Sequence, residues 1–417
     1  MLQLIGVIIA FILVILLICF KINFGFALII GAISLAIFSF NEINLVEIPL
    51  KMIGNQEFLI DTALLAILMT LIYMLAKIMQ ETGAIKKLID SLRTIFTKGG
   101  TMAAVPAIYG LMPVPGGALF SAPVVEEEGE EFNIHVDKKN FFNVWFRHIW
   151  FPVYPISITI LTTAKLAEIE VADLIRGNFL TFVAMVLLGF ILLTFFVNKN
   201  KDFIKSKKMD FKCIKKECKG LLFILPPIIP VFFGFFNILF NVPLEICFIF
   251  GVITSIIILL YLVKTPKSEF KELFKKSITW KFAMLMIGIM VFKEIFDITN
   301  SSIAIFDMIQ GFNVPILLML ILLPLILGLV TGYLLVSITL SYPLLLPFFD
   351  ASGLSVIGFT SLIFMSGFLG YLISPIHLCN VVSSSYLKTE TIKMYPIFIP
   401  TAIVLLLIHV LIVLYVL

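Results

Sequence analysis

Four apolar segments of this 417-residue chain are interrupted by residues that could bind a solute. Two interruptions are Gly-Leu-Met-Pro-Val-Pro-Gly-Gly at 110–117 and Phe-Pro-Val-Tyr-Pro at 151–155. The other two are Gly-Leu-Val-Thr-Gly at 328–332 and Ser-Pro at 374–375. A proline inside a helix frees a backbone carbonyl group, which can bind a cation, whereas the free amide groups at a helix start favour an anion.

The side chains at these interruptions favour a small anion, such as a carboxylate. Arginine, histidine, hydroxyl groups and helix starts suit negative charge, and no aspartate or glutamate stands at any interruption. We therefore expect the substrate-binding residues to be Pro115, Gly116, Gly117, Ser121, Arg147, His148, Tyr154, Thr331, Gly332, Ser337, Ser374, His377, Asn380 and Ser383. The alternative is that these residues have a structural role and bind no substrate. Small and polar residues also hold membrane helices together, and a long arginine side chain can reach the membrane surface. The five cysteines are expected to be free thiols, with no metal site and no cofactor beyond a coupling sodium ion or proton.

The composition indicates what kind of protein must position these residues. Hydrophobic residues make up 61% of the chain and charged residues 13%, whereas soluble domains have about 45–50% and about 25%. This excess excludes a soluble enzyme and a nucleic-acid-binding protein, and it predicts an all-α polytopic membrane protein. Ten segments are long and apolar enough to be transmembrane helices: 2–20, 22–40, 58–80, 141–165, 177–197, 220–240, 244–263, 282–298, 355–386 and 394–417. Two further segments, 101–127 and 313–349, are interrupted near their centres, and we expect them to be opposed re-entrant hairpins.

The positions of the basic residues predict how the spans are oriented. Most of the 30 lysine and arginine residues fall in loops that this arrangement puts on one side, including the segment 198–219. Cytoplasmic loops are enriched in these residues, so we expect a multi-pass protein of the cytoplasmic membrane with both termini outside. A hairpin that crossed the membrane would move the later basic loops to the opposite side.

Each half of the chain then has three spans, a hairpin and two spans, in opposite orientations. We expect a 5+5 inverted-topology repeat with a first repeat at 1–197, a basic cytoplasmic linker at 198–219 and a second repeat at 220–417. Paired interruptions at matching positions of such repeats point to a transport site. Helical spacing of apolar residues at 84–97, and more weakly at 268–280, predicts amphipathic helices.

Three motifs carry a resemblance to a known family. Gly-Leu-Met-Pro-Val-Pro-Gly-Gly-Ala-Leu-Phe-Ser-Ala-Pro at 110–123, Trp-Phe-Arg-His-Ile-Trp at 145–150 and Ser-Pro-Ile-His-Leu-Cys at 374–379 resemble an uncharacterised prokaryotic integral membrane family, the domain of unknown function 401. In that family an acidic residue often follows the second tryptophan, whereas here Phe151 follows Trp150. More remotely, the layout resembles the ion-transporter superfamily of gluconate, citrate, dicarboxylate and sodium/proton carriers. That resemblance implies opposed hairpins and an elevator motion in a homodimer.

These features together predict a secondary active transporter that moves a small, carboxylate-type anion by alternating access, coupled to sodium or protons. The expected partners are the solute, the lipid bilayer and a second copy of the chain, and no nucleic acid. The alternative is a cation/proton antiporter, in which Asp61 or Glu294 would have to reach the membrane centre. An enzyme is not expected, because no His-Glu-x-x-His or Gly-x-Ser-x-Gly motif is present, and the chain lacks Gly-x-x-x-x-Gly-Lys for direct use of ATP.

Overall fold

The computed structural model describes residues 2–39, 44–95, 98–112, 117–199, 218–301 and 315–417. Every regular element in these ranges is helical, and seven helices or helix runs are long and apolar enough to cross a membrane. The seven are Gln56–Glu81, Val171–Val197, Lys219–Asn237, Leu244–Val263, Leu334–Ser352, Val356–Tyr386 and Thr391–Tyr415. The prediction of an all-α membrane protein with several spans is therefore confirmed, while the count of ten spans plus two re-entrant hairpins stays a prediction.

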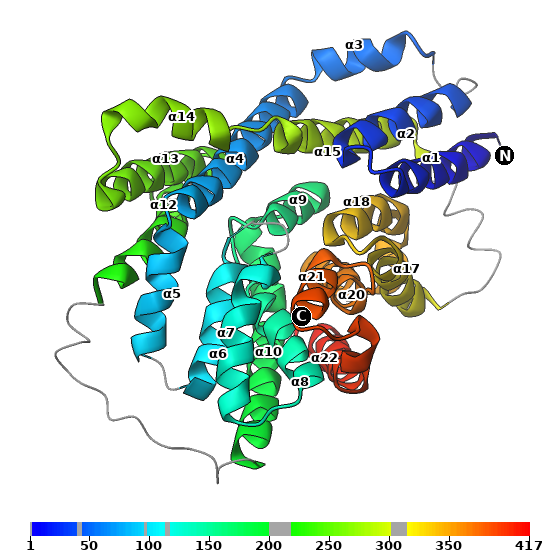
Figure 1. The fold of residues 1–417 in the computed structure, drawn as a ribbon. Helices are drawn as coiled ribbons and strands as arrows, with labels where there is room; N and C mark the ends of the chain where they lie inside the picture. Colours follow the sequence, from blue (N-terminus) through cyan, green and yellow to red (C-terminus); the bar gives the residue numbers. More distant parts are fainter. Residues whose placement is uncertain (1, 40–43, 96–97, 113–116, 200–217, 302–314) are drawn as a thin grey trace.

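The helices form two groups, which Figure 1 shows as an upper arc and a cluster below it. The first, which we call the peripheral group, contains α1, α2, α4, α12, α13 and α15, which pack in the order α1, α2, α15, α4, α13, α12. Their bounds are Leu2–Cys19, Phe24–Phe38, Gln56–Glu81, Leu225–Phe240, Leu244–Val263 and Lys281–Ile298. Helices α2 and α15 cross closely, because a Cβ atom added to Gly288 would lie 2.3 Å from the carbonyl oxygen of Gly25.

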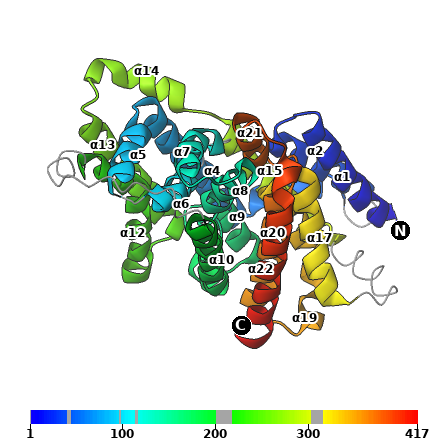
Figure 2. The same ribbon diagram turned by 60° about the horizontal axis from the view of Figure 1, so that its bottom comes forward.

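The second, which we call the central group, is built around the buried helix α20 (Val356–Ile373). Its other main helices are α6 (Lys98–Gly110), α7 (Ala118–Glu131), α8 (Val136–Arg147), α9 (Ile158–Ala167), α10 (Val171–Lys199), α17 (Ile316–Thr331), α18 (Leu334–Leu345), α21 (Leu378–Tyr386) and α22 (Tyr395–Tyr415). Both views place α12 and α13 far from α17 and α22 (Figures 1 and 2). The peripheral group contains α1, α2 and α4 from the first half of the chain and α12, α13 and α15 from the second. The central group likewise contains helices from both halves.

The interrupted segments fold as the proline and glycine positions predict. The segments 101–127 and 313–349 each contain two helices that pack on each other, α6 with α7 and α17 with α18. The predicted spans 141–165 and 355–386 are both broken, between α8 and α9 and between α20 and α21. Each break leaves two half-helices whose ends can face a cavity.

Shorter helices connect the main ones. The predicted amphipathic segment 84–97 is α5 (Ala84–Ile95), which buries Leu88 and Leu92 and exposes Lys86 and Lys87. The predicted amphipathic segment 268–280 corresponds to α14 (Lys267–Ser277). We did not predict α3 (Glu47–Gly54). It lies between α2 and α4, just as α14 lies between α13 and α15. The linker 198–219 lies mostly outside the described residues. The order of elements is thus alike in the two halves, and their opposite orientation stays a prediction.

Close packing of α17 on α20 gives a first prediction. Gly370→Ala should destabilise the protein, because the added Cβ atom would lie 2.0 Å from the carbonyl oxygen of Leu325, and overpacking of this kind costs about 1–3 kcal/mol. Thermal unfolding in detergent should show a clearly lower Tm than for wild type. Gly54→Ala is the matched control, since no atom lies within 4 Å of its added Cβ. Equal Tm values for the two variants would contradict the close contact of α17 and α20.

Candidate functional site: a cavity between the two helix groups

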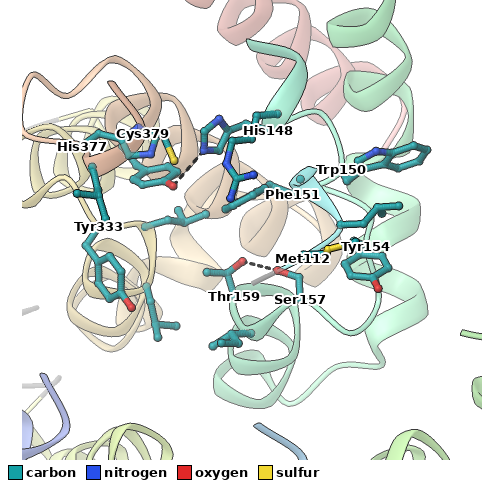
Figure 3. A pocket seen from close by; sticks show the side chains of 18 of the residues that line it. Met112, His148, Trp150, Phe151, Tyr154, Ser157, Thr159, Tyr333, His377 and Cys379 are labelled. Carbon is teal, nitrogen blue, oxygen red and sulfur yellow. Dashed lines mark hydrogen bonds between the residues drawn. The ribbon is translucent and has the colours of Figure 1, made fainter. Parts of the chain in front are cut away.

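A cavity of about 200 Å³ lies where the central group faces α4 and α15 of the peripheral group. This volume is below the roughly 300–1,000 Å³ of pockets for drug-sized ligands, so the cavity suits a small solute. Its lining residues are Ile72, Gly110, Leu111, Met112, Arg147, His148, Trp150, Phe151, Tyr154, Ile156, Ser157, Ile158, Thr159, Phe282, Gly332, Tyr333, Leu334, Leu335, Tyr371, His377, Leu378 and Cys379 (Figure 3).

Three helices of the central group begin at this cavity. Residues 157–159 start α9, residues 333–335 start α18 and residues 377–379 start α21, and all three sets line the cavity wall. The N-cap residues of these helices are Ser157, Tyr333 and His377, and none of their side chains accepts a hydrogen bond from a backbone amide of the first helical turn. The N-terminal end of a helix carries roughly half a positive charge. The C-terminal ends of α6, α8 and α17 line the same wall at Gly110, Arg147 and Gly332. The three N-terminal ends therefore offer backbone amide groups to an anion, while the net charge of the wall comes from side chains.

Arg147 adds a full positive charge to the same wall. It stands in the last turn of α8 and is only 4% exposed. A Cβ atom on Gly117 would lie 2.4 Å from both terminal nitrogens of the guanidinium, and one on Gly110 would lie 2.0 Å from the Arg147 carbonyl oxygen. The absence of a side chain at these two glycines therefore makes room for Arg147 between α6 and α7. The C-terminal end of α8 favours the positive charge.

Two histidines and a cysteine gather on one side of the cavity (Figure 3). The ring centroids of His148 and His377 are 4.8 Å apart, and His377 lies 4.0 Å from the ring of Tyr371. Nδ1 of His148 donates to the carbonyl of Val144 at 2.7 Å, so Nε2 accepts a hydrogen bond from the Tyr371 hydroxyl at 3.2 Å. His377 is 1% exposed, and neither of its ring nitrogens has a hydrogen-bond partner among the described residues.

This cluster also has the donor atoms of a metal site. One ligating atom from each of His148, His377 and Cys379 lies within 4.8 Å of the others, and imidazole and thiolate suit transition metals. However, Cys379 lies beside the Arg147 guanidinium, and a nearby positive charge disfavours a cation. The buried, unpartnered ring nitrogens of His377 therefore fit an anionic or polar ligand better, and the sequence-based expectation of no metal stays a prediction.

Ser121 and Ser383, both among the predicted site residues, lie in a polar seam between helices and do not line the cavity. Ser121 of α7 donates to Oδ1 of Asn143 at 2.6 Å, and Nδ2 of Asn143 donates to Ser383 of α21 at 2.8 Å. Beside them, Asn140 donates to Ser384 at 2.8 Å. In the described structure these serines join α7, α8 and α21, which is the structural alternative that we gave for them.

Other predicted residues bind the backbone near the breaks. Asn380 donates to the carbonyls of Leu372 and Ser374 at 3.0 and 2.8 Å, and the Ser374 hydroxyl donates to Leu329 at 2.7 Å. These carbonyls already accept hydrogen bonds. They are therefore poor candidates for the cation site that freed carbonyls could form.

The remaining predicted residues divide between the cavity and the helices of the second hairpin. Gly332 and Tyr154 line the cavity, although the Tyr154 hydroxyl donates to the carbonyl of Pro227 in α12 at 2.8 Å. Thr331 and Ser337 donate to the carbonyls of Leu327 and Pro324, each at 2.6 Å. Neither lines the cavity. Pro115 and Gly116 lie outside the described residues.

Several contributors to this region were not among our predicted site residues. Tyr333, Tyr371 and Cys379 line the cavity. Tyr333 directly follows the interruption at 328–332 and Cys379 ends the motif at 374–379, whereas Tyr371 lies in an apolar segment without such a signal. Asn178 of α10 donates to the carbonyl of Pro152 at 3.0 Å, which satisfies the break after α8. An asparagine inside an apolar span was the available signal for this residue, but its partner is distant in sequence.

A second, wider cleft of about 820 Å³ is lined by several acidic residues, among them Asp61 and Glu294, which the antiporter alternative would need at the membrane centre. Asp61 forms an ion pair with Lys165 of α9, and Lys293 of α15 pairs with Glu168 at 2.9 Å and with Asp297 at 3.5 Å. Glu245 and Glu294 also line this cleft, and none of these residues lines the smaller cavity.

The polar seam gives a second prediction. A double-mutant cycle of Asn143→Ala and Ser383→Ala should show a favourable coupling energy of about 1 kcal/mol, as measured for hydrogen bonds between membrane helices. The free energies of unfolding of the two single variants, the double variant and wild type give this number. Additive effects would show that the contact between Asn143 and Ser383 is energetically unimportant.

Comparison with known proteins agrees with the resemblance seen in the motifs. The family model described as "Protein of unknown function (DUF401)" matches residues 4–417. No curated protein matches the chain. Since the match spans nearly the whole chain, including α6, α8 and α21 at the cavity, this protein belongs to the DUF401 family.

Proposed function

We propose that this protein is a secondary active transporter that moves a small anion of the carboxylate type across the cytoplasmic membrane. The observation that carries the proposal is the convergence of three helix N-termini and the Arg147 side chain on one small cavity. A carboxylate can accept two parallel hydrogen bonds from a guanidinium group and further bonds from backbone amides. The ring nitrogens of His377, which have no hydrogen-bond partner in the described part of the chain, supply another polar contact.

The position of the cavity between the two helix groups supports alternating access. Ile72 and Phe282 of the peripheral group close the cavity on one side, and the central group supplies the rest of its wall. In the proposed elevator motion, the central group carries the substrate along the peripheral group. The proposed membrane arrangement has ten spans, two re-entrant hairpins formed by α6/α7 and α17/α18, an inverted repeat and both termini outside. The remote resemblance to the ion-transporter superfamily supports a homodimer and coupling to sodium or protons.

The antiporter alternative needs a carboxylate at the substrate cavity. Among the described residues the cavity wall has no aspartate or glutamate. Asp61 pairs with Lys165, and Glu294 accepts a hydrogen bond from Asn55 at 3.0 Å, both in the wider cleft. These contacts favour anion transport over cation/proton exchange.

Uptake into proteoliposomes tests the proposed function. Arg147→Gln should reduce uptake of a transported carboxylate at least about tenfold, because a charge-assisted hydrogen bond contributes roughly 1.5–3 kcal/mol. Arg176→Gln is the matched control, since Arg176 is exposed, pairs with Asp173 at 3.0 Å and lies outside the cavity. The proposal fails if no carboxylate in a broad panel is taken up under sodium or proton gradients, or if both variants behave alike.

A pH-sensitive dye inside the same vesicles separates the two candidate functions. Glu294→Gln keeps an oxygen that can accept the Asn55 hydrogen bond, so it should leave carboxylate uptake within about twofold of wild type. Asp61→Asn should likewise leave the substrate cavity intact. If instead sodium addition changes the luminal pH without any carboxylate, and either substitution abolishes that change, the protein is a cation/proton antiporter.

A further inference from the structure

The charges around the cavity set a limit on the charge of the substrate. Arg147 is the only lysine, arginine, aspartate or glutamate among the described residues of the wall. The guanidinium can compensate the charge of one carboxylate, and the backbone amides at the three helix N-termini can donate hydrogen bonds to it. A second carboxylate on the same molecule would have to leave water for a wall without another cation, which costs several kcal/mol.

The polar groups that could hold a carboxylate are concentrated on one side. Figure 3 shows His148, His377 and Cys379 together, and Cys379 also lies beside Arg147. His377 has no partner for either ring nitrogen among the described residues, so one ring N–H is available to donate to a ligand oxygen. The anionic end of a ligand therefore belongs on this side.

Most of the remaining wall is apolar and comes from both helix groups. Its side chains include Ile72, Phe151, Ile158, Phe282 and Leu334. Burial of an apolar group against such a surface is favourable by about 25 cal/mol for each Å² removed from water. Burial of a hydroxyl group there without a partner is unfavourable.

The hydroxyl groups of the wall offer little to a polyhydroxylated ligand. In Figure 3, Ser157 and Thr159 lie away from the histidines, and their hydroxyl oxygens hydrogen-bond to each other at 2.9 Å. The Tyr154 hydroxyl donates to Pro227, and the Tyr371 hydroxyl donates to His148. Even with the Tyr333 hydroxyl, which also belongs to the wall, and with the lone pairs that these oxygens retain, the wall can pair only some of the hydroxyl groups of a sugar acid, so the others would be buried without partners.

From these features we infer that the substrate is a small monocarboxylate with an apolar body, either aliphatic or aromatic. This inference rests on the proposed function for the route of the substrate, but the binding selectivity can be measured without transport. The carboxylate lies between Arg147 and His377, and the apolar body lies against Phe282 and the starts of α9 and α18. Dicarboxylates, tricarboxylates and sugar acids are rejected.

Isothermal titration of the purified full-length protein in detergent tests the selectivity directly. The probes are benzoate and butyrate, with succinate and gluconate as charged or hydroxylated competitors and benzamide as the uncharged analogue of benzoate. Benzoate or butyrate should bind at least tenfold more tightly than succinate, gluconate and benzamide. Tighter binding of succinate or gluconate, or equal binding of benzamide, overturns the inference, as does the absence of binding by all five probes.

Two substitutions separate the roles of charge and apolar contact. Phe282→Ala should weaken benzoate binding roughly tenfold while changing acetate binding little, because acetate is too small to depend on that wall. Arg147→Gln should weaken both ligands. Phe235→Ala, on an exposed face of α12, is the control for loss of an aromatic ring and should leave both affinities unchanged. If Phe282→Ala weakens both ligands equally, or neither, the assigned apolar wall is wrong.

Uptake assays distinguish failure of this inference from failure of the proposed function. Benzoate binding that depends on Arg147, without uptake into proteoliposomes, supports the inference and contradicts the transport function. Arg147-dependent uptake of succinate or gluconate in preference to benzoate supports the transport function and overturns the inference.

Discussion

A positive charge buried in an apolar helical protein needs compensation, and the central group is arranged around one such charge on Arg147. Burial of an ion costs several kcal/mol, whereas a helix C-terminus such as that of α8 contributes at most about 2 kcal/mol. Gly110 and Gly117 allow the helices on both sides to approach the arginine. An anion in the adjacent cavity would stabilise the buried charge further. The same charge therefore accounts for the glycines of the first helix pair and for the chemistry of the cavity.

The buried backbone carbonyl groups at the broken spans also need partners, in their case hydrogen-bond donors. Inside a membrane protein each freed carbonyl needs a donor, and here two asparagine side chains supply it. Asn178 binds the carbonyl of Pro152 beside the first break, and Asn380 binds Leu372 and Ser374 at the second. Because these carbonyls are occupied, the backbone amides at the starts of α9 and α21 are the free polar groups of the main chain that the two breaks offer to a ligand. This arrangement supports the proposed anion site, although prolines free carbonyl groups.

Periodicity and breaker residues were sufficient to predict most of the helices, although not α3, and to predict both broken spans and the amphipathic α5. They also identified Arg147, His148 and His377, because charged or ionisable side chains inside apolar spans are unusual. They could not predict that Ser121 binds a neighbouring helix rather than the cavity, since that depends on Asn143 in another helix. Tyr371 and Cys379 were also missing from the predicted site residues, because their place in the cavity wall likewise depends on tertiary contacts. Local sequence shows where a helix breaks, but tertiary contacts decide which side chains face the resulting cavity.

The charge of the cavity also bears on how the proposed transporter would respond to membrane voltage. Moving one elementary charge across the membrane costs or releases about 2.3 kcal/mol per 100 mV. With Arg147 as the only charge among the described residues of the wall, the empty cavity carries one positive charge, and a bound monocarboxylate neutralises it. The loaded central group could then move with little effect of voltage, whereas return of the empty one would depend on it. A dicarboxylate would instead leave the loaded group with one negative charge, so both steps would depend on voltage, and the single arginine therefore links the charge of the substrate to the steps that the membrane potential drives.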